Sequence, residues 1–284
     1  MKVTRSEMLH SQQLAGLSSQ HHYVPVDVPE FGIRTRAYWS IAPPSAVLIF
    51  IHGFAGDSTS TWDSFPSLLV SQKALVGHDL VFYGYDGKST RAHISAGDFE
   101  GFLTSLLTTP VSLPNASLPD EFSRGAGQPY KRAYVIAHSL GAVVTRLAML
   151  LAYRSGALWT PMPEMVFYAP AHMGSNLPRL VKLVSGTLAA RAYMKCQVLQ
   201  DLDTPCQTLT YLQDETDRQR KKYGASILRA NCIMFGHDEN VVNILPFPGD
   251  PDHKRPAFPN RNHITVCKPQ RANDHPLQEL LNCL

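Results

Sequence analysis

The stretch that most constrains the fold of this chain is residues 132–150, RAYVIAHSLGAVVTRLAML. Its apolar run at 134–136 is typical of a buried strand, and the apolar segment at 142–150 is typical of a helix. Small residues two positions before and after Ser139 let a strand and a helix pass closely while the serine takes a strained backbone conformation. The segment therefore predicts a strand, a sharp turn and a helix, with a serine at the apex.

The turn also matches a chemical pattern. Residues 137–141, AHSLG, fit the nucleophile elbow G-x-S-x-G with Ala137 in place of the first glycine. A serine hydroxyl is a poor nucleophile and must stand clear of the sheet beside a base. We therefore interpret Ser139 as a candidate nucleophile. A pattern this short also arises by chance, so an ordinary strand-to-helix turn containing a serine is the alternative.

A second turn lies upstream. The continuous apolar run 46–51 predicts a strand buried on both faces, and it stops at HGFAG, residues 52–56. Acyl transfer produces an oxyanion that backbone N–H groups must meet. A turn of this kind supplies one donor, and the residue after the nucleophile supplies the other. We expect the N–H groups of Phe54 and Leu140 to form this oxyanion hole; a flexible glycine turn is the alternative for 52–56.

With these two motifs the chain resembles the α/β-hydrolase superfamily. HGFAG followed by a Thr-Trp pair at 61–62, then AHSLGA, then YAPAHMGS at 168–175 is similar to the lipase-like serine esterases. Among those, the pattern most resembles the bacterial serine esterases related to GPI inositol-deacylases. The resemblance runs from about residue 46 to the C-terminus. It implies an α/β fold with a mostly parallel central sheet, helices on both faces, and a triad in the chain order serine, acid, histidine.

The acid of such a triad must lie just past the C-terminal end of a strand, where ligands bind in open α/β sheets. Residues 231–236 predict a strand, and HDENVV follows it. Asp238 is the predicted acid, because its D-x-x-V spacing resembles the acid-bearing turn of the family. Glu239 is the close rival, and a turn-forming aspartate is the alternative for Asp238. The earlier predicted strand at 165–168 is followed by no carboxylate.

The base must follow the acid, which leaves His253, His263 and His275. His263 opens HITVCKP, which closely resembles the H-x-T-x-x-K-P segment that carries the catalytic histidine in the same esterases. His253 lies in a turn-rich loop with two carboxylates, which is more typical of a solvated loop than of a metal site. His172, near the expected mouth of the site, is a candidate for substrate binding.

The organisation of the chain follows from its patterns. Residues 1–22 are polar and predict an N-terminal arm, and residues 23–284 predict one α/β-hydrolase domain. Residues 176–225 show helical spacing without a strand, so we expect a helical cap inserted over Ser139; packing helices on the sheet are the alternative. The interval 238–263 is rich in proline, so the last strand of the sheet is expected to be short or missing.

Composition narrows the function classes. A net charge of +3 in 284 residues is too small to indicate nucleic-acid binding. No apolar run approaches the roughly 18 residues of a membrane span, and the start lacks the apolar core of a signal peptide. Five cysteines without a C-x-x-C pair indicate reduced thiols, so we expect a cytoplasmic protein. We expect no metal and no organic cofactor; the sequence does not indicate an oligomeric state.

These features predict hydrolysis of a carboxylic ester, with a small-molecule or lipid-like acyl ester as substrate. Ser139 would form an acyl-enzyme, His263 would move the proton, and Asp238 would orient His263. Acyl transfer to an alcohol other than water is the enzymatic alternative. A non-catalytic binding protein is the alternative of another class, because a fold does not guarantee an activity.

Overall fold

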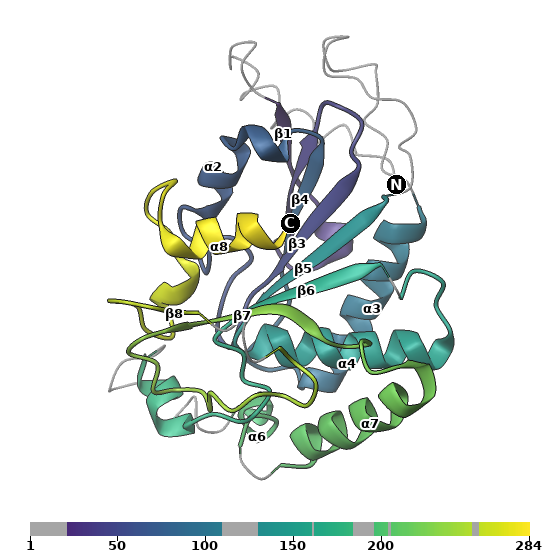
Figure 1. Ribbon diagram of the computed structural model, residues 1–284, viewed down its shortest axis with the longest axis vertical. Helices are drawn as coiled ribbons and strands as arrows, with labels where there is room; N and C mark the ends of the chain where they lie inside the picture. Colours follow the sequence, from purple (N-terminus) through teal and green to yellow (C-terminus); the bar gives the residue numbers. More distant parts are fainter. Residues whose placement is uncertain (1–21, 110–129, 161, 184–195, 204–205, 252–255) are drawn as a thin grey trace.

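The structure of the protein is a computed structural model that describes residues 22–109, 130–160, 162–183, 196–203, 206–251 and 256–284. In this part of the chain, an eight-stranded sheet lies between two layers of helices (Figure 1). The predicted arm at 1–22 falls, except for its last residue, outside the described residues.

The sheet has the strand order β1-β2-β4-β3-β5-β6-β7-β8. The β1–β2 and β2–β4 pairs are antiparallel, and the pairs from β4 through β8 are parallel. All six residues of β3 are buried, as expected for a parallel strand covered on both faces. The predicted mostly parallel sheet is therefore confirmed. The strands are β1 (Tyr23–Asp27), β2 (Arg36–Ser40), β3 (Ala46–Ile51), β4 (His78–Tyr83), β5 (Arg132–His138), β6 (Pro163–Tyr168), β7 (Ala230–Gly236) and β8 (Ala257–Phe258).

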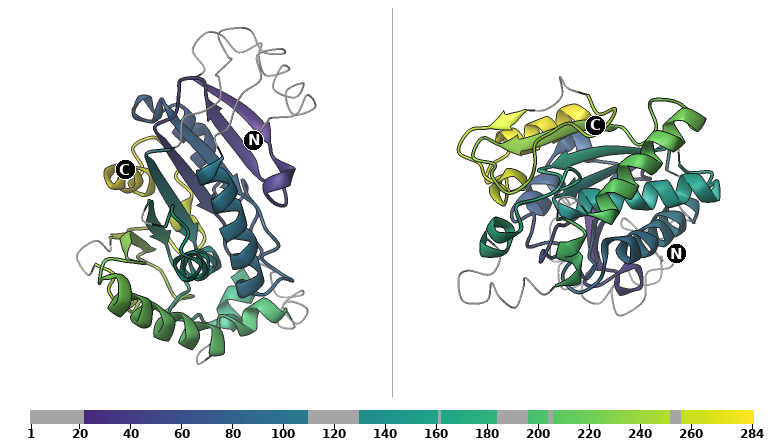
Figure 2. Two further views of the ribbon diagram at one scale, coloured as in Figure 1. Left: turned by 90° about the vertical axis from the view of Figure 1, so that its right-hand side faces the viewer. Right: turned by 90° about the horizontal axis from the view of Figure 1, so that it is seen from below.

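Helices cover both faces of the sheet (Figures 1 and 2). On one face, the β3 side chain Phe50 packs against Phe65 of α2, and the hydroxyl of Tyr168 donates to the main chain at Pro276 of α8. On the other face, Tyr83 of β4 packs against Phe99 of α3, which lies beside α4. The helices are α2 (Phe65–Val70), α3 (Ala92–Thr108), α4 (Leu140–Ser155), α6 (Gln197–Gln200), α7 (Gln207–Tyr223) and α8 (His275–Cys283), with short 3-10 turns η1 (Pro29–Phe31), η2 (Lys73–Leu75) and η5 (Thr265–Cys267).

The start of α4 passes very close to the end of β3. A Cβ atom placed on Gly141 would lie 2.5 Å from the carbonyl oxygen of His52 and 2.6 Å from that of Ile51. Both of those atoms belong to the backbone and cannot move aside as a side chain would. The glycine of the AHSLG turn is therefore required so that the elbow and the turn at 52–56 can meet at one edge of the sheet.

The last strand is short. β8 has two residues and pairs with Phe235 and Gly236 of β7, which confirms the prediction of a short strand. Beyond it, single backbone hydrogen bonds hold the two loops together: the N–H of His237 donates to the oxygen of Phe258 at 2.8 Å, and that of Asp238 donates to the oxygen of Arg261 at 3.0 Å. This end of the molecule is organised by loop contacts.

The segment predicted as a cap is described in part. Residues 177–183 and α7 are helical, whereas 184–195 and 204–205 lie outside the described residues. The helix α7 packs along α4 with its buried residues, which include Leu209, Leu212 and Thr216 (Figure 2). A cap over Ser139 therefore stays a prediction. Within the described part of this segment, α7 lies against α4.

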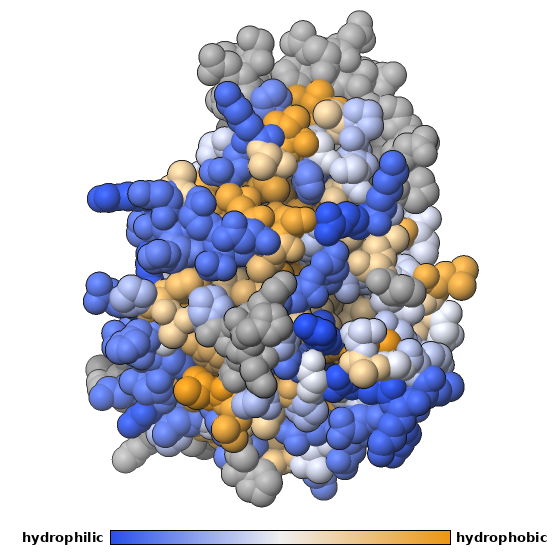
Figure 3. All heavy atoms as spheres, in the orientation of Figure 1, coloured by the Kyte–Doolittle hydropathy of each residue, from blue (hydrophilic) through white to orange (hydrophobic). Residues whose placement is uncertain are grey.

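On the face seen in Figure 3, hydrophilic residues surround smaller groups of apolar ones. None of the helices in the described ranges is long and apolar enough to cross a membrane.

Candidate active site

Ser139 lies at the apex of the predicted sharp turn between β5 and α4. Its backbone has φ 54° and ψ −118°, a conformation that costs a non-glycine residue on the order of 1–3 kcal/mol. Three backbone hydrogen bonds hold it there: its N–H donates to the oxygen of Tyr168, and its oxygen accepts from the N–H groups of Ala142 and Ala171, each at 3.1 Å. Contacts with β6, with the loop after it and with α4 therefore hold Ser139 in this strained conformation.

His263 links this serine to a carboxylate. Its Nε2 lies 3.0 Å from Oγ of Ser139, and its Nδ1 lies 3.2 Å from Oε2 of Glu239. An ionised carboxylate only accepts hydrogen bonds, so Nδ1 of the neutral ring carries the proton and Nε2 faces the hydroxyl as an acceptor. Ser139, His263 and Glu239 form one continuous chain of hydrogen bonds. All three side chains are buried, with Ser139 only 1% exposed.

The prediction that Asp238 is the carboxylate facing His263 is wrong: Glu239 makes that contact. The side chain of Asp238 is 68% exposed and lies 3.8 Å from Nδ1 of its neighbour His237. The physical reason is the tight turn after β7, in which the N–H of Glu239 donates back to the oxygen of Gly236. This turn directs residue 239 inward, and the longer glutamate side chain reaches the imidazole.

The surroundings of Glu239 favour its charged form. Burial raises the pKa of its carboxyl, but the hydrogen bond and charge of His263 lower it, as do the N–H groups of Val241 and Val242. These two N–H groups donate to Oε1 at 2.8 and 3.1 Å. The net pKa is below its ordinary value, so the carboxylate is ionised and faces the imidazole as an anion.

The turn at 52–56 lies directly against the nucleophile. A Cβ atom placed on Gly53 would be 2.8 Å from Cβ of Ser139. Within the turn, Nε2 of His52 accepts from the N–H of Tyr85 at 3.3 Å, so Nδ1 is left to donate to the oxygen of Gly53 at 2.9 Å. Burial lowers the pKa of His52, which keeps the ring neutral. His52 thus braces the turn as an uncharged group.

The two predicted oxyanion donors come from these adjoining turns. Phe54 is part of the turn braced by His52, and Leu140 is the first residue of α4, immediately after Ser139. Both residues are buried. Their position fits the prediction, and their role as donors stays a prediction.

His172 lies in the loop after β6. Nε of Arg146 donates to its Nδ1 at 3.3 Å, and its ring packs 4.9 Å from that of Phe247. Arg146 itself is fully buried and pairs with Asp250. The predicted contact of His172 with substrate stays a prediction; its contacts include the side chain of Arg146 and the rings of Phe247 and Phe167. The candidate His253 falls outside the described residues.

The buried ion pair of Arg146 and Asp250 was not predicted from the sequence. The guanidinium lies between the rings of Phe247 and Phe167, and its NH1 donates to the oxygen of Leu228 at 2.5 Å. One signal was present in the sequence, namely an arginine within the otherwise apolar run 142–150. The pair ties the nucleophile helix to the chain on either side of β7.

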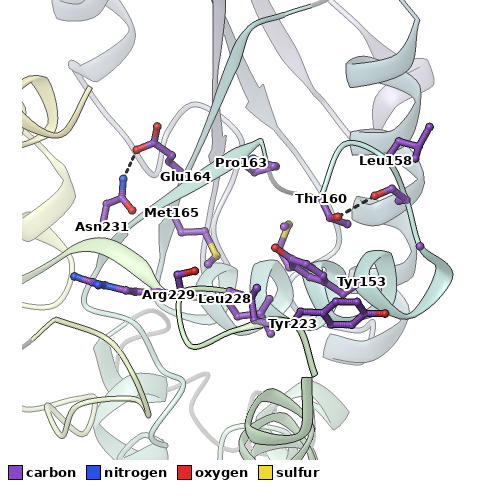
Figure 4. Close-up of a pocket in the computed structure, with 15 residues that line it drawn as sticks. Tyr153, Leu158, Thr160, Pro163, Glu164, Met165, Tyr223, Leu228, Arg229 and Asn231 are labelled. Atoms are coloured by element: carbon purple, nitrogen blue, oxygen red, sulfur yellow. Dashed lines mark hydrogen bonds between the residues drawn. The ribbon is translucent and has the colours of Figure 1, made fainter. Parts of the chain in front are cut away.

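Two of the hollows in the described part of the chain lie close to this framework, and a further one of about 720 Å³ lies between α3 and the residues around Phe31. One, of about 190 Å³, is lined by His52, Gly56 and Tyr85 and adjoins the turn beside Ser139. The other, of about 670 Å³, lies at the starts of β6 and β7, at the sheet edge opposite the ends that carry Ser139 and Glu239. Figure 4 shows the rings of Tyr153 and Tyr223 close together in this larger hollow. The smaller hollow lies on the side of the turn 52–56 that Tyr85 and His52 line, and so lies nearer the candidate site than the hollow at the starts of β6 and β7 does.

Comparison with protein families decides the identity of the fold. Residues 48–280 match a model of the alpha/beta hydrolase family. The chain belongs to the α/β-hydrolase family. The predicted α/β-hydrolase fold is thereby confirmed. The narrower resemblance to the GPI inositol-deacylases stays a prediction.

Solved structures give the same fold. The mature lipase BlEst2 of Bacillus licheniformis is 15% identical, with a TM-score of 0.54 over 82% of this chain and 92% of that one. The carboxylesterase CesB of Bacillus subtilis is also 15% identical, with a TM-score of 0.49 over 98% of this chain and 95% of that one. No curated protein matches the sequence. At 15% identity, the likeness to the mature lipase shows the fold alone.

Proposed function

We propose that this α/β-hydrolase cleaves carboxylic esters through an acyl-enzyme on Ser139. The observation that carries the proposal is the chain of hydrogen bonds from Glu239 through His263 to the hydroxyl of Ser139. A nucleophile hydrogen-bonded to a base, which is in turn oriented by a third group, is the arrangement that activates a serine. The strained backbone of Ser139 is a second support, because such strain is found where function requires it.

The mechanism follows from the geometry. Oγ of Ser139 attacks the acyl carbonyl while Nε2 of His263 takes its proton, and the imidazolium then gives that proton to the departing alkoxide. Water attacks the acyl-enzyme in the second half, giving its proton to His263 and releasing the acid and the free serine. Glu239 stabilises the imidazolium in both halves. The N–H groups of Phe54 and Leu140 hold the oxyanion of each tetrahedral intermediate.

Two alternatives remain for the test. Acyl transfer to an alcohol other than water would use the same residues and differ only in the acceptor. A non-catalytic binding protein on this fold would have no need of a buried carboxylate at 3.2 Å from a histidine that faces a serine. The intact chain of three residues therefore supports catalysis.

We also propose that the segment 176–225 contributes a cap to the site. Its first residues dock on the loop that carries Glu239: the N–H of Asn176 donates to the oxygen of Val241 at 2.6 Å, and NH1 of Arg179 donates to the oxygen of Asn240 at 3.1 Å. A cap excludes water and shapes the acyl pocket. Changes there are expected to alter the preference for acyl-chain length more than the reactivity toward an acetate ester.

A panel of p-nitrophenyl esters from acetate to palmitate tests the proposal. The unchanged protein is expected to hydrolyse at least one ester in the panel, and Ser139→Ala is expected to reduce that rate to the background. Addition of a soluble alcohol as competing acceptor separates hydrolysis from acyl transfer. A folded protein that hydrolyses none of the esters, or a Ser139→Ala variant within tenfold of the parent, would contradict the proposal.

A further inference from the structure

A second buried imidazole lies beside the candidate base and takes no part in the chain of three residues. His138 is the last residue of β5, immediately before Ser139. Its Nε2 lies 2.8 Å from the main-chain oxygen of His263, and the two rings are 5.0 Å apart between centroids. The strand of the nucleophile therefore contacts the backbone of the residue that serves as base.

The protonation of His138 follows from its contacts. A carbonyl oxygen only accepts, so Nε2 carries the proton and donates it. Burial lowers the pKa of His138 most, and the neighbouring His263, Lys268 and His52 also lower it, so that against the hydrogen bond to His263 the net pKa is about 3. The ring is thus neutral at ordinary pH. Its Nδ1 is buried, has no hydrogen-bond partner among the described residues, and lies near Gly53.

A neutral ring in this orientation is not a second base for Ser139. Its protonated nitrogen is directed at the carbonyl of His263, and its other nitrogen lies at the turn 52–56. What the ring supplies is one fixed donor. Buried polar groups are normally hydrogen-bonded, so burying a histidine whose Nδ1 lacks a partner has a cost. The bond that Nε2 makes to His263 is a reason for a histidine at this position.

The loop of His263 is tied to the rest of the molecule at several points: η5 packs against β7, Sγ of Cys267 donates to the oxygen of Thr61, and Nζ of Lys268 donates to that of Ser60 at 3.3 Å. The preceding strand β8 has two residues, and the loop joins β7 through the N–H of Asp238. The N–H groups of Ile264 and Thr265 donate to Oδ1 of Asn262. These bonds shape the loop internally and do not connect it to β5. The bond from His138 does so directly.

We propose that His138 is a positioning residue that holds the main-chain carbonyl of His263 through its Nε2–H, and so fixes the base relative to Ser139. The inference rests on the proposed function, in which His263 is the base. His138 is the last residue of β5, and Ser139 follows it directly. This bond therefore ties the base to the strand that also places the nucleophile.

Two isosteric amides separate this role from packing. The amide nitrogen of glutamine lies about where Nε2 of histidine lies, whereas that of asparagine lies about where Nδ1 lies. His138→Gln is expected to keep kcat within about fivefold of the parent. His138→Asn and His138→Leu are expected to lower kcat by about 10- to 100-fold with KM within about twofold, and to shift the pH profile of kcat/KM.

Thermal unfolding of each variant provides the control, because a packing role predicts losses of activity that follow losses of stability. Equal kcat for the Gln and Asn variants, or losses that track the melting temperature across all three, would overturn the proposal.

The low-field proton resonance of Nδ1–H of His263, bonded to Glu239, gives a readout that does not need activity. It is expected to persist in His138→Gln and to shift or vanish in His138→Asn. An unchanged resonance in the Asn variant would overturn the positioning role. A parent protein that hydrolyses no ester but shows the expected pattern would instead overturn the proposed function alone.

Discussion

The two halves of the candidate site are built in different ways. Ser139 lies between the seven-residue strand β5 and the sixteen-residue helix α4, and almost all residues of both are buried. Glu239 and His263 lie on loops on either side of the two-residue strand β8, and individual hydrogen bonds hold them. The nucleophile is thus fixed by regular elements, and the acid and base are fixed by the contacts of loops.

This difference determines how each half of the site responds to a substitution. On the nucleophile half, many buried contacts together place the backbone of Ser139, so a substitution has to disturb packing, such as that of β3 against α4, to move this backbone. On the loop half, one donor or acceptor governs the direction of a side chain. A substitution there can abolish the chemistry while leaving the core of the sheet intact.

The largest effect is expected where the two halves meet. Ser139→Ala and His263→Ala are each expected to lower kcat by about 10⁴-fold or more, because members of a triad act as a unit. The double variant is expected to lose little beyond either single one. Steady-state kinetics on one soluble ester measures all three. Losses that multiply in the double variant would show that the two residues act independently.

The next effect separates neighbouring carboxylates on the loop half. Glu239→Gln removes the charge that faces His263, and is expected to lower kcat by about 10²- to 10⁴-fold, as for the acid of other triads. Asp238→Asn changes an exposed carboxylate and is expected to alter kcat by less than about threefold. Both are measured on the same ester. A large loss at Asp238 with Glu239→Gln near normal would reverse the assignment.

A smaller effect tests the packing on the nucleophile half. Gly141→Ala would press a methyl group against the backbone of β3, and is expected to destabilise the protein by about 1–3 kcal/mol or more. Gly97→Ala on α3 is the matched control, because nothing lies within 4 Å of the added atom and alanine favours a helix interior by about 0.5–1 kcal/mol. Urea unfolding measures both, and equal stability of the two variants would contradict the account.

The last expected effect is a dependence of stability on pH, which leaves the activity at neutral pH unchanged. Folding lowers the pKa of His138 to about 3 from an unfolded value near 6.5, so the unfolded chain binds the proton first as pH falls. The contribution of the neutral ring is present above about pH 6.5 and declines toward pH 3, with a slope of at most about 1.4 kcal/mol per pH unit. His138→Gln is expected to flatten the curve of unfolding free energy between pH 6.5 and 4; an unchanged slope would argue against a buried neutral His138.

The same contrast explains what could be predicted from the sequence. The strands at 46–51 and 132–138 and the elbow at Ser139 follow from apolar runs and small residues, which act locally and are therefore visible in the sequence. His263 was found through a motif that resembles other esterases. The shortness of β8 was foreseen from the prolines between residues 238 and 263.

What failed was a choice between adjacent residues. Asp238 and Glu239 follow the same strand. The turn that directs Glu239 inward is closed by the bond from its own N–H to the oxygen of Gly236, and it is held by the bond from the N–H of Asp238 to the oxygen of Arg261, which is distant in sequence. Arg146 and Asp250 are 104 positions apart in the sequence. The one local indication of this pair is the charge of Arg146 within a mostly apolar segment. Long-range backbone contacts of loops carry no local signature.

Covalent labelling of the nucleophile tests the central claim most directly. A fluorophosphonate reacts with a serine that a base has activated, and peptide mass spectrometry identifies the labelled residue. The account predicts one adduct, on Ser139, that His263→Ala abolishes and Glu239→Gln slows by about 100-fold or more while Asp238→Asn does not. A folded protein that takes no label, or takes it on another serine, would contradict the account.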